Sequence, residues 1–315
     1  MHDTKANKRR KFRMYIRQPE LHELKITKTL LDVLEVIEDY RVTTQDVIVK
    51  SVSASPSYIN KVLTVCFHHG LVDRKRDEDE EEKWKKRIGS KKILYLRNNK
   101  GKKVLEETRG KALSRTNRGY KNKIAEPKNL RHRMMVDVFR SVVKQVYEQH
   151  DDFTEFKWKE KLGSGKNAQD TRIKVEVDYG NGDIRTRSNF PDGIFYLKDK
   201  REDYHCFYFE ADRGTMRWKR FKQKIENYWL WRKQGLSEEE HGFTNFRVLT
   251  VTETAARRDS LIEKLNEYTQ KKKLSVGRGM FWFASAEDYS ITDPFLVLGP
   301  IWKTPLDDKF HLLIK

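Results

Sequence analysis

Two short apolar runs in the second half of the chain contain acidic residues, and this combination restricts the possible folds more than any other feature. Residues 190–197 form one run, with Asp192 near its start, and residues 206–212 form the next, with Glu210 and Asp212 near its end. Short apolar or aromatic runs bounded by charged or turn residues are typical of buried strands. Burying a carboxylate without compensation is costly, so these residues need a metal ion or a basic partner.

Both kinds of compensation are consistent with the sequence. Carboxylates from neighbouring strands hold Mg²⁺ in many nucleases, and residues 210 and 212 share one face of a strand, so both could reach one ion. In the alternative interpretation, Asp192 only begins a turn before Gly193, while Glu210 and Asp212 end a strand opposite basic residues. The residue types by themselves leave the two interpretations open.

The charge of the chain indicates a polyanionic partner. The 315 residues suggest about two domains and carry a formal net charge of +19. Residues 1–128 hold 32 Lys and Arg against 18 Asp and Glu, a net charge of +14, which leaves +5 for residues 129–315. A polyanion that binds such a chain is most simply nucleic acid. Residues 1–24 predict a basic arm, which is either a disordered tail or a segment that grips a nucleic acid backbone.

The cysteines and the hydropathy indicate a cytoplasmic protein without a membrane partner. Cys66 and Cys206 both lie in apolar runs, and no Cys or His spacing is typical of a zinc site. Buried free thiols suit a reducing compartment. No apolar run approaches the length of a membrane span, and no signal peptide is visible.

Residues 25–109 predict a winged helix-turn-helix domain. Apolar periodicity indicates a helix over 27–40, and Thr43-Thr44 offers hydroxyl caps for a second helix. Ser55-Pro56 predicts the start of a third helix, with a capping serine before a proline in the first turn. Strands over 71–74 and 91–96 form the wing, and a helix follows from residue 102. This order is typical of a DNA-binding module, although some winged helices dock proteins instead.

The third helix has one apolar stripe and one polar face. The polar face offers hydrogen-bonding and basic groups suited to phosphates and base edges. Together with one arginine from the wing, the predicted DNA-binding residues are Ser57, Tyr58, Asn60, Lys61, Thr64 and Arg74. The wing loop is acidic from 77 to 82 and then basic, so it forms either a self-neutralising tip or a basic tip on DNA.

A polar and basic linker over 110–128 leads to a second domain over 129–315. Its sequence predicts a helix over 130–150, a strand over 153–159 and a hairpin that turns at residues 180–182. After the two acidic strands come a helix over 216–233, a strand over 246–251, a helix over 255–270 and a strand over 280–284. This order describes an α+β domain, a mixed sheet flanked by helices.

That order resembles the PD-(D/E)XK nuclease-like fold. In that family an Asp on one strand and an Asp or Glu on the next bind Mg²⁺, and a Lys two residues later orients the attacking water. Pro191-Asp192 and Glu210 match the first two elements. Asp212 stands where the lysine is expected, and this departure puts the usual mechanism in doubt.

A longer pattern resembles the replication-relaxation family of plasmid and mobile-element proteins. It consists of Asp192-Gly193, Glu210-x-Asp212-Arg213-Gly214-Thr215, Lys224 and Tyr228, with Leu130-Arg131-His132 before it and Pro300-Ile301-Trp302 after it. Members of this family pair an N-terminal winged helix with a nuclease-like domain. They are implicated in DNA relaxation, plasmid replication and conjugative mobilisation.

The resemblance implies Asp192, Glu210 and Asp212 as ligands of Mg²⁺ or Mn²⁺. Lys224 lies on one stripe of its helix and could supply the missing cation, and His132 could act as a general base or metal-site partner. Each has a structural alternative: Lys224 pairs with a carboxylate in an inactive core, and His132 is a capping or core residue. Tyr228 is either a packed side chain or a covalent nucleophile.

We therefore expect a replication-relaxation or mobilisation protein that binds double-stranded DNA at an origin or transfer site, alongside other replication or mobilisation proteins. Nicking of DNA by metal-dependent hydrolysis would be its activity. The alternatives are a non-catalytic initiation or mobilisation factor and a winged-helix regulator of copy number or transcription.

Overall fold

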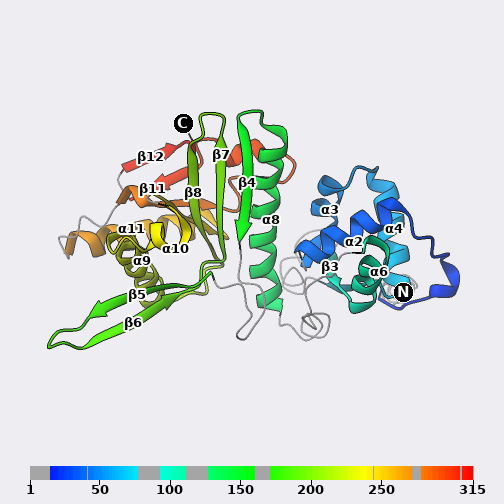
Figure 1. Ribbon diagram of the computed structural model, residues 1–315, viewed down its shortest axis with the longest axis horizontal. Coiled ribbons are helices and arrows are strands. Elements are labelled where there is room, and N and C mark those ends of the chain that lie inside the picture. Colours follow the sequence, from blue (N-terminus) through cyan, green and yellow to red (C-terminus); the bar gives the residue numbers. More distant parts are fainter. Residues whose placement is uncertain are drawn as a thin grey trace, which may run out of the picture. The chain divides into compact units, whose positions relative to one another are not determined.

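The computed structural model describes residues 15–40, 42–76, 93–110, 127–159, 171–243, 245–271, 278–305 and 307–314. The chain forms two compact units, Met1–Val138 (unit 1) and Phe139–Lys315 (unit 2), and both mix helices with strands (Figure 1). The α+β class expected from the sequence is confirmed. Most of the basic arm, the charged wing loop over 77–92 and residues 111–126 of the linker lie outside the described residues.

Unit 1 combines helices with a three-stranded antiparallel sheet of order β1-β3-β2. Its elements are η1 (Pro19–Leu21), α2 (Lys28–Tyr40), β1 (Val42–Thr44), α3 (Gln45–Ser51), α4 (Pro56–His68), β2 (Val72–Arg76), β3 (Ile93–Arg97) and α6 (Asn99–Arg109). The hairpin of β2 and β3 was predicted. Strand β1 was not, because its three residues form a strand only through pairing with β3, where Val42 lies opposite Leu96.

Local end signals define the helices of unit 1. The side chain of Ser55 accepts a hydrogen bond from the amide of Tyr58 at 3.3 Å, so the predicted cap of α4 is confirmed. Gly70, at φ +74°, follows this helix in the left-handed conformation that glycine tolerates. The hydroxyl cap predicted for α3 was wrong, because Thr44 occupies the capping position without a side-chain hydrogen bond.

Unit 2 is built on a seven-stranded mixed sheet of order β12-β11-β10-β9-β8-β7-β4. Strands β8, β9 and β10 run parallel, and the remaining pairs are antiparallel. The strands are β4 (Phe153–Lys159), β7 (Gly193–Asp199), β8 (Tyr204–Asp212), β9 (Arg247–Thr252), β10 (Phe281–Ser285), β11 (Trp302–Thr304) and β12 (Asp307–His311). The sequence predicted no strand for β11 or β12, which are short and exist only through pairing at the sheet edge.

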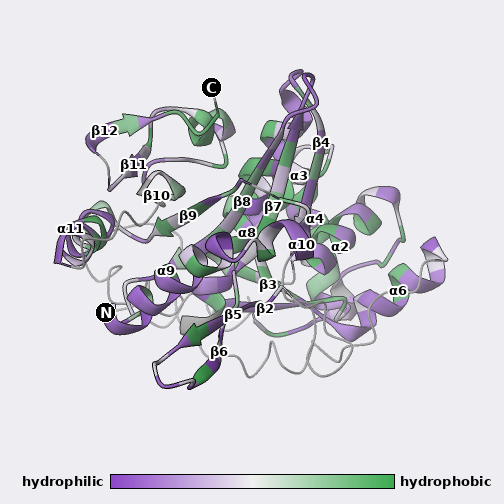
Figure 2. Cartoon of the chain, turned by 60° about the vertical axis from the view of Figure 1, so that its left-hand side comes forward, coloured by the Kyte–Doolittle hydropathy of each residue, from purple (hydrophilic) through white to green (hydrophobic). Residues whose placement is uncertain are grey.

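Helices cover both faces of this sheet. On one face, α9 (Trp218–Lys233) and α11 (Ala255–Lys271) share a buried cluster with β8, in which Tyr208 and Tyr228 lie. On the other face, Phe139 of α8 (Pro127–Gln149) stacks on Phe209 with 4.2 Å between ring centroids. Hydrophobic residues concentrate in β8 and β9 at the middle of the sheet (Figure 2). Residues on these central strands are therefore buried from both sides.

Smaller elements complete unit 2. The hairpin of β5 (Ile173–Asp178) and β6 (Ile184–Asn189) extends beside α9 and turns at Gly180-Asn181-Gly182, where all three residues have positive φ. This turn was predicted. The short helix α10 (Leu236–His241) was not predicted, and 3₁₀ turns lie at Arg278–Met280 and Pro294–Leu298.

Candidate functional site

The three acidic residues lie at adjacent ends of β7 and β8. Glu210 and Asp212 are within β8 and are 5% and 3% exposed, whereas Asp192 is half-buried just before β7. The prediction that Asp192 belongs to the strand was wrong by one residue. Its amide still donates to the carbonyl of Phe209 at 2.9 Å, and its Oδ2 accepts from the amide of Ala211 at 2.9 Å. These bonds fix the Asp192 carboxylate beside the backbone that flanks Glu210.

Gly193 is required here by close packing. A Cβ atom at this position would lie 2.3 Å from the ring of Trp158 on β4, far inside van der Waals contact. Any side chain would have to displace Trp158 or the start of β7, which Asp192 directly precedes. The Asp192-Gly193 pair in the sequence therefore has a structural cause.

Glu210 receives hydrogen bonds from two side chains of α9. The Tyr228 hydroxyl donates to Oε1 at 2.7 Å, and the Lys224 ammonium forms an ion pair with Oε2. Residues 224 and 228 lie one turn apart and therefore face the same strand. The sequence predicted that Lys224, on one stripe of its helix, could supply a cation. In the structure Lys224 contacts the carboxylate of Glu210 on β8.

Burial and charge shift the titration of this cluster. Burial raises the pKa of Glu210, the ammonium of Lys224 opposes that rise, and the charge of Asp192 adds to it. Burial lowers the pKa of Lys224, but Glu210 and Asp192 outweigh it, so the net shift is upward and the lysine stays charged. Burial first and then Glu210 raise the pKa of Tyr228 well above its usual value. A phenolate there is unfavourable, which argues against Tyr228 as a covalent nucleophile.

Asp212 has partners from another part of the fold. Arg257, in the first turn of α11, donates from Nε to Oδ2 at 2.9 Å, and the amide of Gly214 donates to Oδ1 at 2.8 Å. Arg257 also donates from Nη2 to the carbonyl of Met216 at 2.7 Å. Sequence reasoning missed Arg257, because only the parallel pairing of Asp212 with Thr252 brings the residues that follow β9 beside it.

The polar face of α4 is the second predicted site. Ser57, Tyr58, Asn60 and Lys61 are exposed, and among the residues that the structure describes no ion pair forms with Lys61. The other two predicted residues are tied into the fold. Thr64 accepts a hydrogen bond from Arg74 at 3.3 Å, and the Arg74 guanidinium lies 4.5 Å from the ring centroid of Phe67.

Residues 34–246 match the family model described as replication-relaxation, a span of more than half the chain. This chain belongs to the replication-relaxation family. Curated proteins yield no match, and neither do solved structures. The resemblance identified from the sequence is confirmed, and membership supports a role related to replication or mobilisation that involves nucleic acid.

The matched span of this replication-relaxation protein covers the helices α3, α4 and α9 and the strands β7 and β8. It therefore includes Asp192, Glu210, Asp212 and Lys224 but ends before Arg257.

Both cysteines of the chain are free and buried, and burial raises the pKa of each thiol to about 12. Within the described segments, no helix has the length and apolar character needed to cross a membrane.

The carboxylates of the replication-relaxation protein do not form one ligand set. Across the described segments, no group of three or more His, Cys, Asp or Glu side chains could hold a metal ion. Asp212 does not fit such a set, because Arg257 and Gly214 engage both of its oxygens. Asp192 and Glu210 remain as two oxygen donors of the kind that Mg²⁺ and Mn²⁺ prefer. His132 lies on the part of α8 that belongs to unit 1, whereas these carboxylates belong to unit 2.

Proposed function

We propose that this replication-relaxation protein binds duplex DNA through unit 1, as a winged helix-turn-helix, during replication or mobilisation of a plasmid or other mobile element. The polar face of α4 carries the proposal. Its exposed side chains Ser57, Tyr58, Asn60 and Lys61 all lie in the first two turns. In helix-turn-helix proteins, the N-terminal residues of the recognition helix contact base edges.

The surroundings of α4 support this function. The helices α2, α3 and α4 precede the β-hairpin of β2 and β3. This is the order of elements in a winged helix, with the hairpin as the wing. The net charge of +14 over residues 1–128 suits a partner that carries a phosphate on every nucleotide. The buried face of α4, with Ile59, Leu63 and Cys66 in the core, anchors the helix so that its polar face stays outward.

Two substitutions on α4 test the proposal. Lys61→Ala is expected to weaken binding to all duplexes and to lower the salt dependence by about one counterion. Asn60→Ala is expected to cost about 1–3 kcal/mol on the recognised site only, because an amide that contacts a base edge reads sequence. Fluorescence anisotropy with duplexes from the origin or transfer region, at several salt concentrations, measures both effects. Lys309→Ala, at an exposed lysine of β12, is the matched control. Unchanged affinity and salt dependence in both α4 variants would indicate a protein-docking winged helix instead.

A second candidate function is metal-dependent nicking at unit 2, as in a PD-(D/E)XK-like nuclease. The observation that favours it is the Asp192 and Glu210 pair beside Lys224, because three groups of these types supply two ligands and a cation. Asp192 and Glu210 would hold Mg²⁺ or Mn²⁺. When bound, such an ion activates water and neutralises charge on a phosphodiester. Lys224 would hold positive charge beside the scissile phosphate.

The nicking function requires a change within the cluster. Lys224 is bound to Glu210 in the structure, so a phosphate would have to compete for the ammonium. A carboxylate oxygen has two lone pairs, so Glu210 could keep the hydrogen bond from Tyr228 and also coordinate a metal ion. If this exchange does not occur, unit 2 is a scaffold and the protein is a non-catalytic initiation or mobilisation factor.

A cleavage assay on supercoiled plasmid that carries the candidate origin distinguishes a nickase from a non-catalytic initiation or mobilisation factor. With Mg²⁺ or Mn²⁺, nicking is expected for the wild type and for Asp308→Asn, an exposed carboxylate control. Asp192→Asn and Glu210→Gln are expected to abolish it, and EDTA should do the same. Cleavage that survives both substitutions would exclude this site. Binding of duplex DNA without cleavage in any metal would favour the accessory factor.

A further inference from the structure

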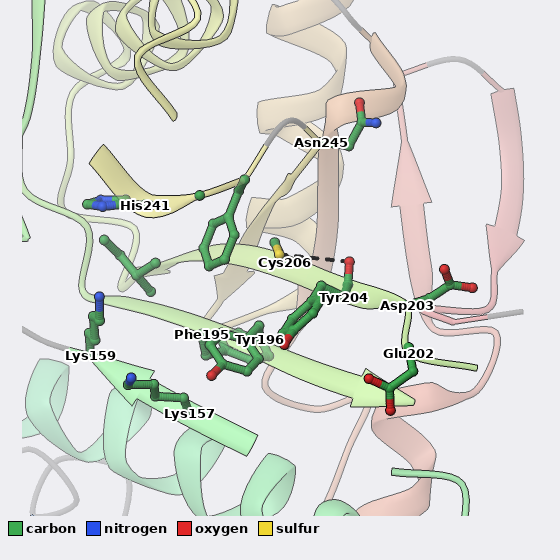
Figure 3. Close-up of a pocket in the computed structure, with 13 residues that line it drawn as sticks. Lys157, Lys159, Phe195, Tyr196, Glu202, Asp203, Tyr204, Cys206, His241 and Asn245 are labelled. Atoms are coloured by element: carbon green, nitrogen blue, oxygen red, sulfur yellow. Dashed lines mark hydrogen bonds between the residues drawn. The ribbon is translucent and has the colours of Figure 1, made fainter. Parts of the chain in front are cut away.

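A pocket of about 590 Å³ opens on the sheet of unit 2, and none of Asp192, Glu210 and Asp212 lines it (Figure 3). It lies over β4, β7 and β8, and its volume is within the range of about 300–1,000 Å³ found for ligand pockets. Tyr204 and Cys206 of β8 line it. Alternate residues of a strand share a face, so Tyr204 and Glu210 face the same side from opposite ends of β8.

The lining groups are sorted along the pocket by their chemistry (Figure 3). Lys157 and Lys159 of β4 and His241 of α10 lie toward one end. Glu202 and Asp203, in the turn between β7 and β8, lie at the other. Aromatic rings occupy the middle, so the pocket runs from a cationic end through aromatic rings to an acidic end.

The aromatic rings of the pocket contact one another, and the side chain of Tyr204 stays exposed. Tyr196 meets Tyr204 edge to face, with 5.3 Å between ring centroids, and meets Phe243 in the same way at 6.0 Å. Tyr204 is 51% exposed. The Tyr196 hydroxyl donates to Glu155, and burial together with that bond raises the pKa of Tyr196 to about 12. The Tyr196 hydroxyl is therefore neutral, and its hydrogen bond to Glu155 holds the ring in place.

The two lysines of the cationic end have no ion-pair partner within the described segments. Among the described residues, neither Lys157 nor Lys159 forms an ion pair, whereas Lys198 on the same sheet pairs with Glu202. Both ring nitrogens of His241 are buried without a hydrogen-bond partner in the described part of the chain. The imidazole of His241 therefore keeps hydrogen-bonding capacity that the described residues do not use.

We infer that this pocket binds a nucleotide of single-stranded DNA. The phosphate would lie at Lys157 and Lys159, and the base would stack against Tyr204 in the aromatic middle. Glu202 and Asp203 would accept hydrogen bonds from amino groups of the base. Proteins that bind single strands combine basic grooves with exposed aromatic rings in this way. Duplex DNA does not fit, because its bases are paired and stacked and cannot reach the rings.

The inference is independent of duplex binding by α4, since the pocket belongs wholly to unit 2. Two variants test it in the full-length chain: Tyr204→Ala, and the double variant Lys157→Gln with Lys159→Gln. All three positions lie on the sheet surface or its rim, so the core is left intact. Fluorescence anisotropy with a labelled mixed-sequence 12-nucleotide single strand, in the presence of excess unlabelled duplex that saturates α4, measures the binding.

Tyr204→Ala is expected to weaken single-strand binding about tenfold, because a stacked base contributes on that scale. The lysine double variant is expected to lower the salt dependence by roughly 1.4 in log–log slope. Tyr179→Ala, at an exposed tyrosine of the β5–β6 hairpin, and Lys309→Gln are the controls and should bind as the wild type does. Wild-type affinity and salt slope in both pocket variants would overturn the inference.

Two further measurements distinguish a DNA strand from a free nucleotide and from binding elsewhere. Ultraviolet crosslinking of a single strand that contains 5-iodouracil should label the peptide around Tyr204. Labelling confined to α4 would overturn the assignment. Millimolar dTMP or dAMP should compete only weakly, since a strand adds neighbouring phosphates. Competition by the mononucleotide at the affinity of the strand would show that the pocket takes free nucleotides, which also overturns the inference.

Discussion

The polar residues of α4 and those of the carboxylate cluster differ in how their hydrogen-bonding capacity is used. On α4, Asn60 and Lys61 face outward, and no described residue pairs with the lysine. In unit 2, Glu210 and Asp212 are buried, and every carboxylate oxygen accepts a hydrogen bond from within the fold. The face of α4 is ready to bind a partner without rearrangement. The cluster first stabilises unit 2, and any chemistry there has to displace an internal partner.

The largest expected effect comes from removing one charge of the buried pair. Lys224→Met leaves Glu210 buried and uncompensated, so we expect unit 2 to lose about 3–5 kcal/mol of stability. Urea unfolding followed by tryptophan fluorescence measures it, because six of the seven tryptophans lie in residues 139–315. Lys224→Met combined with Glu210→Gln should recover much of the loss. Equal loss in the single and double variants would show that the lysine acts by packing and not by charge.

A smaller effect is expected from the neutral donor of the same cluster. Tyr228→Phe removes the hydroxyl that donates to Glu210 and leaves Oε1 with one donor fewer, which should cost about 1–3 kcal/mol. Tyr268→Phe is the matched control, because the Tyr268 hydroxyl donates to Glu226 at 2.6 Å in a more exposed setting. Equal losses of stability in the two variants would mean that the buried Tyr228–Glu210 hydrogen bond contributes no more than the more exposed Tyr268–Glu226 bond.

The third prediction concerns pH. Because the pKa of Glu210 is raised on folding, the folded state binds this proton more tightly than the unfolded state. The contribution of Glu210 is then greatest below the usual carboxyl pKa and declines as pH rises through the raised value, by at most about 1.4 kcal/mol per pH unit. The raised pKa of Lys224 affects the stability only at alkaline pH. There the stabilisation contributed by the charged lysine is lost as the pH rises through the pKa of Lys224 in the folded state.

Urea unfolding of the wild type and of the Glu210→Gln, Lys224→Met double variant between pH 4.5 and 7.5 tests this. Relative to the double variant, the wild type should lose stability as pH rises in this window. A constant difference, or one that grows with pH, would contradict the raised pKa of Glu210.

The smallest effect on stability is expected on α4. Asn60→Ala and Lys61→Ala remove exposed side chains that contribute little to the core, so the free energy of unfolding should change by no more than about 0.5 kcal/mol. Circular dichroism during thermal unfolding measures it. Losses comparable to that of Tyr228→Phe would mean that the α4 face also supports the fold, and would remove the contrast between the two regions.

Local sequence signals predicted much of the fold. The Ser55-Pro56 start of α4, the Gly70 after it and the Gly-Asn-Gly turn of the β5–β6 hairpin all act over a few residues, so they can be recognised without a partner. Strands β1, β11 and β12 were missed because three to five residues have too little pattern of their own. Their conformation depends on pairing with a strand elsewhere in the sequence.

The candidate site divides in the same way. Helical spacing placed Lys224 and Tyr228 on one face, and both reach Glu210. Strand alternation placed Glu210 and Asp212 on one face, but the two carboxylates bind different internal partners and do not converge on one point. Arg257, which is 45 residues after Asp212, takes that carboxylate. The pocket of Lys157, Tyr204 and His241 likewise joins residues from distant segments that no periodicity relates.

The sequence by itself determined the α+β class, the polar face of α4 and the placement of Glu210 and Asp212 in a buried strand, because these depend on periodicity, capping and composition. The family was identified from the resemblance of a short motif. The tertiary structure decided which cation compensates which carboxylate and which side chains share a pocket. The physical reason is that a buried charge interacts with whatever lies within a few ångströms, and that neighbour is set by strand order and helix packing. Asp212 shows this most directly, since the parallel pairing of β8 with β9 brings Arg257 to it.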